Sequence, residues 1–408
     1  MRSIFLGYYL PTEKEFKKLW EEGCFVLDTN VLLNLYQYSR DTLNLWFDVL
    51  EQFKTRIWIP HQVALEYQEN RLSKISEQTR MYETIKSKLE DTLQVIEVLL
   101  SEEHPSIQKD ELMEGIRRAF SEAEHYLTKA KEGHPDLFSK DEIREKIDSL
   151  FDGKVGEPLP SQELENLYKD GEKRYKHGIP PGYKDAKKGR DRVKRYGNLV
   201  LKDIYGDLIL WYQIIGKAIE SKRPIVFITG DKKEDWWWIY EGRTIGPRPE
   251  LRTEMMQKAG MLFYMYRPER FIEIAAQRLG IEKAEGVIEE TKKVGVLSWK
   301  EEIIEALQAL EGEATLAQIY EYVESHTSRD LNQYPHWQAA IRGTLQAYSS
   351  DASDKVFRGQ DLFHRVSRGR WALRNRGESD NSDADTSGDS PTMRAADAAS
   401  PRANRGGL

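Results

Sequence analysis

The sequence predicts a large α/β domain with a parallel sheet, followed by a small domain of three helices and a β-hairpin. Short apolar runs that end near acidic residues alternate with amphipathic segments over residues 1–280. A strongly helical, charged stretch at 71–178 interrupts this alternation. Beyond residue 297, three helical patterns precede two strand patterns. Alternating strands and helices are typical of a parallel sheet, which is the basis of the first prediction.

Composition limits the class of protein. A chain of 408 residues, 39% hydrophobic and 32% charged, is long enough for two or three domains with a buried core. No apolar run approaches the roughly 18 to 20 residues that span a bilayer, and the N-terminus lacks the apolar core of a signal peptide. The single cysteine, Cys24, excludes an intramolecular disulfide, and the eight histidines are scattered, which argues against a zinc site. These features predict a cytoplasmic protein that does not enter a membrane.

The first half of the α/β domain is read from capping and apolar patterns. A Thr12 cap and apolar residues at helical spacing predict a helix over 12–23. We then expect a buried strand at 25–28 and one or two helices over 31–53. A second strand at 57–60, ended by Pro60, and a further helix from 61 onward should follow.

The helical stretch at 71–178 is expected to be an insertion between strands of the sheet. This insertion could be a helical hairpin that only packs on the sheet, or it could contact the substrate. The sequence favours the two interpretations equally. The α/β pattern then returns, with a helix, a strand and a last edge strand at 203–221, 225–229 and 261–266.

The C-terminal third divides into three segments. Residues 281–296 are predicted to be a linker. Residues 297–375 contain three helical patterns and a hairpin turning at Arg368-Gly369, the composition of a winged helix-turn-helix domain. Residues 376–408 contain no aromatic residue and no lysine, so they cannot bury enough apolar area to offset the entropy of ordering. We expect this tail to be disordered.

Four acidic residues lie where a parallel sheet places its site. Asp28 closes the first strand run and Glu66 follows the second, whereas Asp207 opens a helix and Asp231 closes the run PIVFITGD. Sites of open α/β sheets lie outside the carboxyl ends of the strands, and carboxylate oxygens are the ligands of hard divalent cations. The pattern therefore indicates a metal-dependent nuclease.

Each of these residues also has a simpler interpretation. In LDTN, Asp28 can bind metal while Thr29 and Asn30 hydrogen-bond that carboxylate or a phosphate, but all three are also common helix N-caps. Glu66 lies three residues after the core position Val63, so it points inward unless it is an ordinary solvated carboxylate. Asp235 lies within one turn of Asp231, and the two could reach one pair of cations.

A basic segment could balance these acids. Residues 182–198 hold seven Lys or Arg against two Asp, a local charge of +5 in a chain whose net charge is −7. Polyanionic substrates require such a counterweight. We expect phosphate contacts or stabilisation of transition-state charge from Lys184, Lys187 and Lys188. The alternative is an exposed, mobile loop.

Taken together, these motifs resemble the PIN-like nuclease superfamily, and within it the large bacterial PIN-like proteins. The resemblance covers roughly residues 20–275 and is carried by FVLDTNVLLNLY, IPHQVALEYQENR, IPPGYKDAKK, YGDLILWYQII and VFITGDKKEDWW. It implies that Asp28, Glu66, Asp207 and Asp231, with Asp235 as an auxiliary acid, hold Mg²⁺ or Mn²⁺ and hydrolyse phosphodiester bonds in RNA or DNA. The long insertion departs from compact members and leaves the substrate class open.

The C-terminal module resembles winged-helix domains attached to bacterial nucleases. This resemblance implies contacts with duplex DNA from Arg342 in the third helix and Arg368 in the wing, although the same fold also binds proteins. The architecture suggests an endonuclease in defence against foreign nucleic acid. A non-catalytic nucleic-acid-binding scaffold and a toxin are the rival interpretations. A homodimer and a regulatory protein partner are further expectations from the family.

Overall fold

The computed structural model describes residues 1–100, 108–186, 193–241, 243–281, 284–294, 298–327, 329, 331, 334–351, 357 and 361–374. The chain divides into two compact units, Met1–Ser298 and Trp299–Leu408. None of the helices in the described ranges combines the length and the hydropathy of a membrane span.

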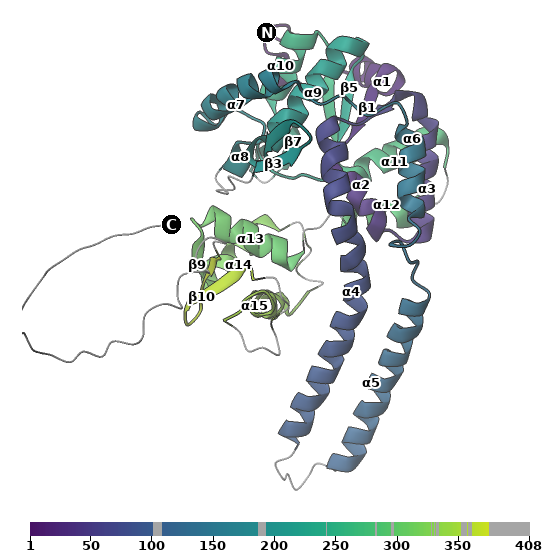
Figure 1. The fold of residues 1–408 in the computed structure, drawn as a ribbon, viewed down its shortest axis with the longest axis vertical. Coiled ribbons are helices and arrows are strands. Elements are labelled where there is room, and N and C mark those ends of the chain that lie inside the picture. Colours follow the sequence, from purple (N-terminus) through teal and green to yellow (C-terminus); the bar gives the residue numbers. More distant parts are fainter. Residues whose placement is uncertain are drawn as a thin grey trace, which may run out of the picture. The chain divides into compact units, whose positions relative to one another are not determined.

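A four-stranded parallel sheet forms the centre of the first unit (Figure 1). Its strands, in spatial order, are β2 (Ile57–Trp58), β1 (Cys24–Leu27), β5 (Ile225–Ile228) and β8 (Phe263–Tyr266). Every residue of β1 and β5 is buried, because helices cover both faces of the sheet. The expected α/β class with a central parallel sheet is confirmed, and β8 lies at its edge as predicted.

Aromatic contacts show which helices cover each face. Phe25 of β1 packs against Trp20, Phe53 and Phe271, so one face is covered by α1 (Glu13–Glu22), α3 (Arg40–Gln52) and α11 (Pro268–Leu279). Phe263 of β8 packs on Trp211 of α9 (Gly206–Ser221), which covers the opposite face. The helix α10 (Pro249–Ala259) packs beside α9. Thr12 caps α1 in a capping box, as its sequence predicts.

The helical insertion continues without interruption from the helix that follows β2. A single helix, α4 (His61–Leu99), runs for 39 residues from the end of β2. Figure 1 shows α4 and α5 (Lys109–Glu132) running side by side away from the sheet. The chain returns through α6 (Glu142–Phe151) and α7 (Ser161–Lys176), and a bridge between Ile59 and Val155 brings it back to the sheet edge.

Several small elements were not expected from the sequence. Two antiparallel hairpins form, β3–β4 (Val193–Tyr196 and Leu199–Lys202) and β6–β7 (Trp237–Tyr240 and Arg243–Pro247). The remaining short helices of this unit are α2 (Thr29–Asn34), α8 (Tyr183–Ala186), η1 (Leu6–Tyr8), η2 (Leu35–Gln37), η3 (Lys54–Arg56) and η4 (Asp203–Tyr205).

The segment predicted as a linker, 281–296, is instead helical over α12 (Glu285–Val294). Thr291 is fully buried and accepts a hydrogen bond from Trp46 Nε1 at 3.2 Å. Glu290 accepts hydrogen bonds from the Ser39 and Thr42 hydroxyl groups. These contacts attach α12 to α3 within the first unit. Residues 285–294 are therefore a packed helix and not a free linker.

The described residues of the second unit form three α-helices and a three-stranded antiparallel sheet of order β10-β11-β9. Its elements are α13 (Trp299–Ala309), β9 (Glu313–Thr315), α14 (Leu316–His326), α15 (Trp337–Ala347), β10 (Phe363–Ser367) and β11 (Arg370–Leu373). Ile303, Ile341 and Phe363 are fully buried in its core. The hairpin is present, but β9 adds a third strand that the sequence did not suggest. The tail, 376–408, lies outside the described residues.

Candidate functional site

Asp28 lies immediately after β1, at the carboxyl end of the sheet. It is also the N-cap of α2, where its Oδ1 accepts from the Thr29 backbone N–H at 2.7 Å. Its Oδ2 accepts from Asn30 Nδ2 at 2.6 Å and from the Thr229 hydroxyl at 2.6 Å. Asp28 therefore caps a helix, and it also lies within the cluster of acids that the sequence suggested.

Asn30 connects the turn after β1 to the turn after β5. Its side-chain oxygen accepts from the Gly230 backbone N–H at 2.7 Å while its amide nitrogen donates to Asp28. A Cβ at residue 230 would lie 3.0 Å from that oxygen, so glycine permits the close approach. In this structure Asn30 orients a carboxylate, which is one of the two roles considered from the sequence.

Glu66 lies in the second turn of α4 and faces Asp28 through a shared neighbour. Its carboxylate accepts from the Thr29 hydroxyl at 2.8 Å and from Gln62 Nε2 at 2.7 Å. A Cβ built on Gly206 would lie 3.3 Å from Glu66 Oε1, which places this carboxylate against the first residue of α9. The positive end of the helix dipole is a favourable position for a negative charge.

Asp207 and Asp231 share a cationic partner. The Nζ atom of Lys233 lies 3.3 Å from Asp207 Oδ2 and 3.0 Å from Asp231 Oδ2. Trp236 Nε1 also donates to Asp207 at 3.2 Å. The backbone N–H of Asp231 donates to the Thr229 hydroxyl oxygen at 2.9 Å.

Three residues thus link the four predicted acids into one network. Thr29 donates from its backbone N–H to Asp28 and from its hydroxyl to Glu66. The Thr229 hydroxyl donates to Asp28 and accepts from the backbone N–H of Asp231, and the Lys233 ammonium pairs with Asp231 and Asp207. Thr229 and Lys233 were not singled out from the sequence, although both lie in the TGDKK segment around Asp231. Hydrogen-bonding residues within two positions of a predicted ligand are a signal that could have identified them.

The network concentrates negative charge. Burial raises the pKa of Asp28 to about 6, and the neighbouring Glu66 and Asp231 contribute to that rise. Burial also raises the pKa of Glu66. Within the described ranges, however, no three His, Cys, Asp or Glu side chains come close enough together to hold a metal ion.

Asp235 has a different environment from the other acids. Its side chain is fully buried, and its Oδ2 accepts from the backbone N–H groups of Gly182 at 3.1 Å and Lys184 at 3.2 Å. It therefore anchors the IPPGYK loop. The role of auxiliary metal ligand that the resemblance implies for Asp235 stays a prediction. Gly182 has φ +88°, and a Cβ there would lie 2.5 Å from Tyr175 Oη and 3.0 Å from Asp207 Cβ, so the loop requires glycine.

The predicted basic contacts are only partly described. The Lys184 ammonium pairs with Glu234 at 2.6 Å, and Lys187 and Lys188 lie outside the described residues. In the second unit, Arg342 donates to Tyr320 Oη at 3.0 Å, and Arg368 lies in the turn between β10 and β11.

Comparison with known families gives the class of the first unit. A family model described as a PIN like domain matches residues 24–251, from the first residue of β1 into α10. This match covers more than half of the chain, so the chain belongs to the PIN-like family. The resemblance to the PIN-like superfamily that the sequence motifs carry is confirmed. PIN-like domains are generally nucleases, which bind and hydrolyse nucleic acid with divalent metal ions. No curated protein and no solved structure shows a significant match.

Proposed function

We propose that this protein is a metal-dependent endonuclease that hydrolyses phosphodiester bonds in RNA or DNA. The observation that supports this most directly is the linkage of Asp28, Glu66, Asp207 and Asp231 at one end of the parallel sheet. Partly buried carboxylates repel one another, and a nearby cation favours their ionised form. Here Asp207 and Asp231 already share the ammonium of Lys233.

The donor chemistry fits Mg²⁺ or Mn²⁺, because carboxylate oxygens are the ligands these hard cations prefer. Asp28, Glu66, Asp207 and Asp231 would hold them, and the ions would supply a water of lowered pKa and neutralise charge on the phosphate. The chain's own contribution is positioning. Thr229 and Asn30 fix the orientation of the Asp28 carboxylate. Thr29 and Gln62 do the same for Glu66.

We propose a winged helix for the second unit, on the basis of its three helices and the β10–β11 hairpin. Arg342 and Arg368 would contact nucleic acid from the third helix and the wing. We further propose a cytoplasmic location and a role in defence, with a homodimer or a regulatory partner as the form in which the protein acts.

A cleavage assay tests the catalytic proposal. Labelled single- and double-stranded RNA and DNA would be offered to the full chain with Mn²⁺, Mg²⁺ or EDTA. We expect metal-dependent cutting that Asp28→Asn abolishes, whereas Asp48→Asn, an exposed aspartate on α3, leaves it unchanged. Full activity in Asp28→Asn would contradict the proposal.

One observation favours a second candidate, a non-catalytic nucleic-acid-binding protein. Lys233 contacts two of the four acids, and no three acids in the described ranges lie close enough together to hold an ion. Calorimetric titration with Mn²⁺ separates the two functions. Stoichiometric binding that is lost in Asp231→Asn supports the nuclease, and the absence of binding supports the second candidate.

A further inference from the structure

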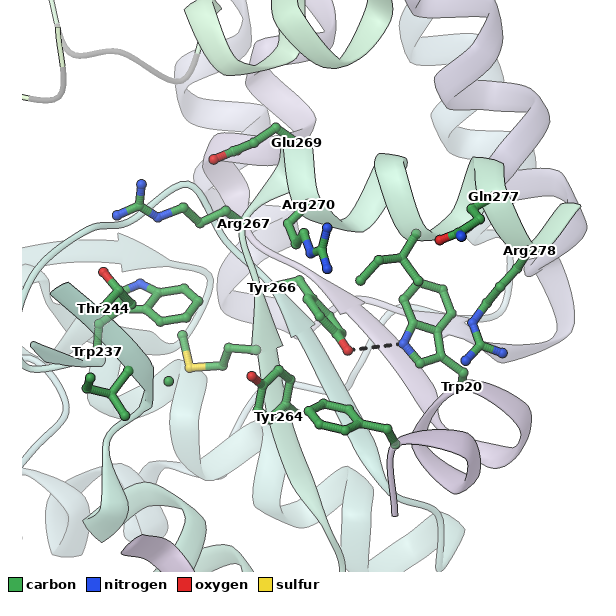
Figure 2. A pocket seen from close by; sticks show the side chains of 15 residues that line it. Trp20, Trp237, Thr244, Tyr264, Tyr266, Arg267, Glu269, Arg270, Gln277 and Arg278 are labelled. Atoms are coloured by element: carbon green, nitrogen blue, oxygen red, sulfur yellow. Dashed lines mark hydrogen bonds between the residues drawn. The ribbon is translucent and has the colours of Figure 1, made fainter. Parts of the chain in front are cut away.

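A large open cavity lies at the free edge of the parallel sheet, beside the candidate site. Its volume is about 890 Å³, and its walls come from β8, the start and end of α11, α1 and the β6–β7 hairpin (Figure 2). The strand β8 and the helix α11 follow the region that the family model matches, which ends at residue 251. Much of this cavity is therefore built by segments that the PIN-like family model does not describe.

The cavity is basic, although the protein as a whole is acidic. Three arginines line it, Arg267, Arg270 and Arg278, against one acid, Glu269. The net charge of the whole chain is −7, so this surface is an exception that attracts anions. In the described part of the chain Arg267 and Arg278 form no salt bridge, and Arg270 pairs with the exposed Glu273 at 2.6 Å.

Aromatic rings lie next to these cations. Figure 2 shows Tyr266 of β8 beside Arg270, and the ring of Tyr264 lies next to that of Tyr266 with centroids 5.1 Å apart. Tyr266 and Trp20 are buried and hydrogen-bonded to each other at 3.1 Å, so they form the floor of the cavity. Tyr264 is only partly buried, and it packs edge-on against Phe16 with the ring centroids 4.9 Å apart. A partly exposed ring beside arginines is the combination on which single-stranded bases stack and phosphates bind.

The cavity adjoins the acids through the sheet itself. The backbone N–H of Thr229 donates to the carbonyl of Tyr266 at 3.1 Å, and the Thr229 hydroxyl donates to Asp28. Two strand spacings therefore separate the end of β8 from Asp28, which is about 10 Å. Trp237, which lines the cavity, donates from Nε1 to the carbonyl of Asp231 at 2.6 Å. A short extended single strand of nucleic acid could therefore occupy the cavity and reach the acids at the same time.

We propose that this cavity binds single-stranded nucleic acid, with Arg267 and Arg270 on its phosphates and Tyr264 against a base. A duplex fits less well, because its bases are stacked on each other and cannot enter a cavity at the edge of a sheet. The inference deepens the proposed nuclease function by assigning its substrate class. It rests on the proposed nuclease function for the statement that the bound nucleic-acid strand is a substrate.

Binding can be measured without cleavage. The full chain carrying Asp28→Asn, in EDTA, would be titrated into fluorescein-labelled oligouridine and oligothymidine of about 12 nucleotides, followed by anisotropy. Arg267→Gln with Arg270→Gln is compared with Arg40→Gln and Arg144→Gln, a pair of exposed arginines outside the cavity. Circular dichroism checks that each variant is folded.

We expect the cavity variant to bind single strands about tenfold more weakly. The slope of log affinity against log salt should flatten by about 1.4, because each phosphate contact contributes about 0.7 on a single strand. The control pair should retain both values. Tyr264→Leu should weaken binding at least about fivefold and leave the salt slope unchanged, because stacking carries no charge.

Two results would overturn the inference. One is a cavity variant that binds single strands with unchanged affinity and slope, and the other is an equal loss of affinity for a blunt duplex of the same length. The oligouridine and oligothymidine arms show whether RNA or DNA is preferred. If the parent chain cuts nothing but the cavity variant loses binding, the nuclease proposal fails and the cavity assignment stands. If the parent cuts and the cavity variant binds normally, the cavity assignment fails alone.

Discussion

The ammonium of Lys233 lies 3.0 Å from Oδ2 of Asp231, only two residues away along the chain. The backbone N–H of Lys233 also donates to Asp231 Oδ1 at 2.7 Å, so one residue contacts both oxygens of the carboxylate. Nζ also reaches Asp207, so one ammonium neutralises both acids. In the metal site that we propose, a divalent cation and this ammonium would compete for one position.

Lys233→Met should increase the affinity for Mn²⁺. Without the ammonium, Asp207 and Asp231 repel each other until a cation binds, so the ion no longer displaces a partner. We expect roughly tenfold tighter binding by calorimetry, which corresponds to about 1.4 kcal/mol. The matched control is Lys217→Met, because Lys217 has a similar side-chain exposure, 21% against 22%, and pairs with Glu220. Weaker Mn²⁺ binding in Lys233→Met would show that the lysine does not compete with metal.

Asp235→Asn should leave metal binding intact. The buried carboxylate of Asp235 accepts two backbone hydrogen bonds from the IPPGYK loop, and asparagine retains one acceptor oxygen for them. We expect Mn²⁺ affinity within about twofold of the parent, while Asp231→Asn loses about tenfold or more. Equal losses in the two variants would show that Asp235 is itself a metal ligand.

The central strands could be predicted from the sequence because they are buried on both faces. The runs around Phe25 in β1 and Val226 in β5 are continuously apolar, which is the signal of an interior parallel strand. The β3–β4 hairpin carries no such signal, because most of its residues are exposed. The helix α12 was read as a linker because it is mostly polar, although Val287 and Thr291, four residues apart, share its buried face.

The network around the acids was only partly predictable, for a related reason. Strand ends indicated where Asp28 and Asp231 would lie, since parallel strands end at one edge. The positions of Lys233 and Asp235 depend on how the chain turns after β5, and a sequence pattern does not specify that turn. Lys233 and Asp235 are only two residues apart in TGDKKED. Lys233 nevertheless contacts the acids of the site, whereas Asp235 contacts the IPPGYK loop.

Thr229→Val tests whether the hydrogen-bonded network positions the acids. Valine keeps the shape of threonine but removes the donor to Asp28 and the acceptor for the Asp231 N–H. We expect kcat to fall by about 10- to 100-fold with a folded protein, the usual effect of losing a residue that orients a ligand. Thr79→Val is the control, because the Thr79 hydroxyl donates to the carbonyl of Ile75 within α4, away from the acids. Rescue of kcat in Thr229→Ser, which restores the hydroxyl, would exclude a merely steric effect.

Glu254→Gln should destabilise the first unit in a pH-dependent way. Glu254 of α10 pairs with Arg174, Lys258 and Trp211 Nε1, and Arg174 donates to the carbonyl of Pro180 in the IPPGYK loop. Burial alone would raise the pKa of Glu254, but these partners outweigh it and lower that pKa below the usual 4.5. Arg174 would keep its ion pair with Asp170 at 2.9 Å but lose its more buried partner. This loss should cost roughly 3 kcal/mol of unfolding free energy at pH 7.

The sign of the pH dependence follows from that lowered pKa. A carboxylate with a folded-state pKa below its unfolded value stabilises the protein above pH 4.5, and this contribution disappears as pH falls through the folded-state pKa. Glutamine does not titrate, so the difference in unfolding free energy between parent and Glu254→Gln should shrink steadily on acidification. Urea denaturation at several pH values, followed by tryptophan fluorescence, measures it. Glu220→Gln, whose side chain is 72% exposed, should show almost no difference at any pH. A Glu254→Gln difference that stayed constant from neutral to acid pH would mean that shape, and not charge, holds α10 against the IPPGYK loop.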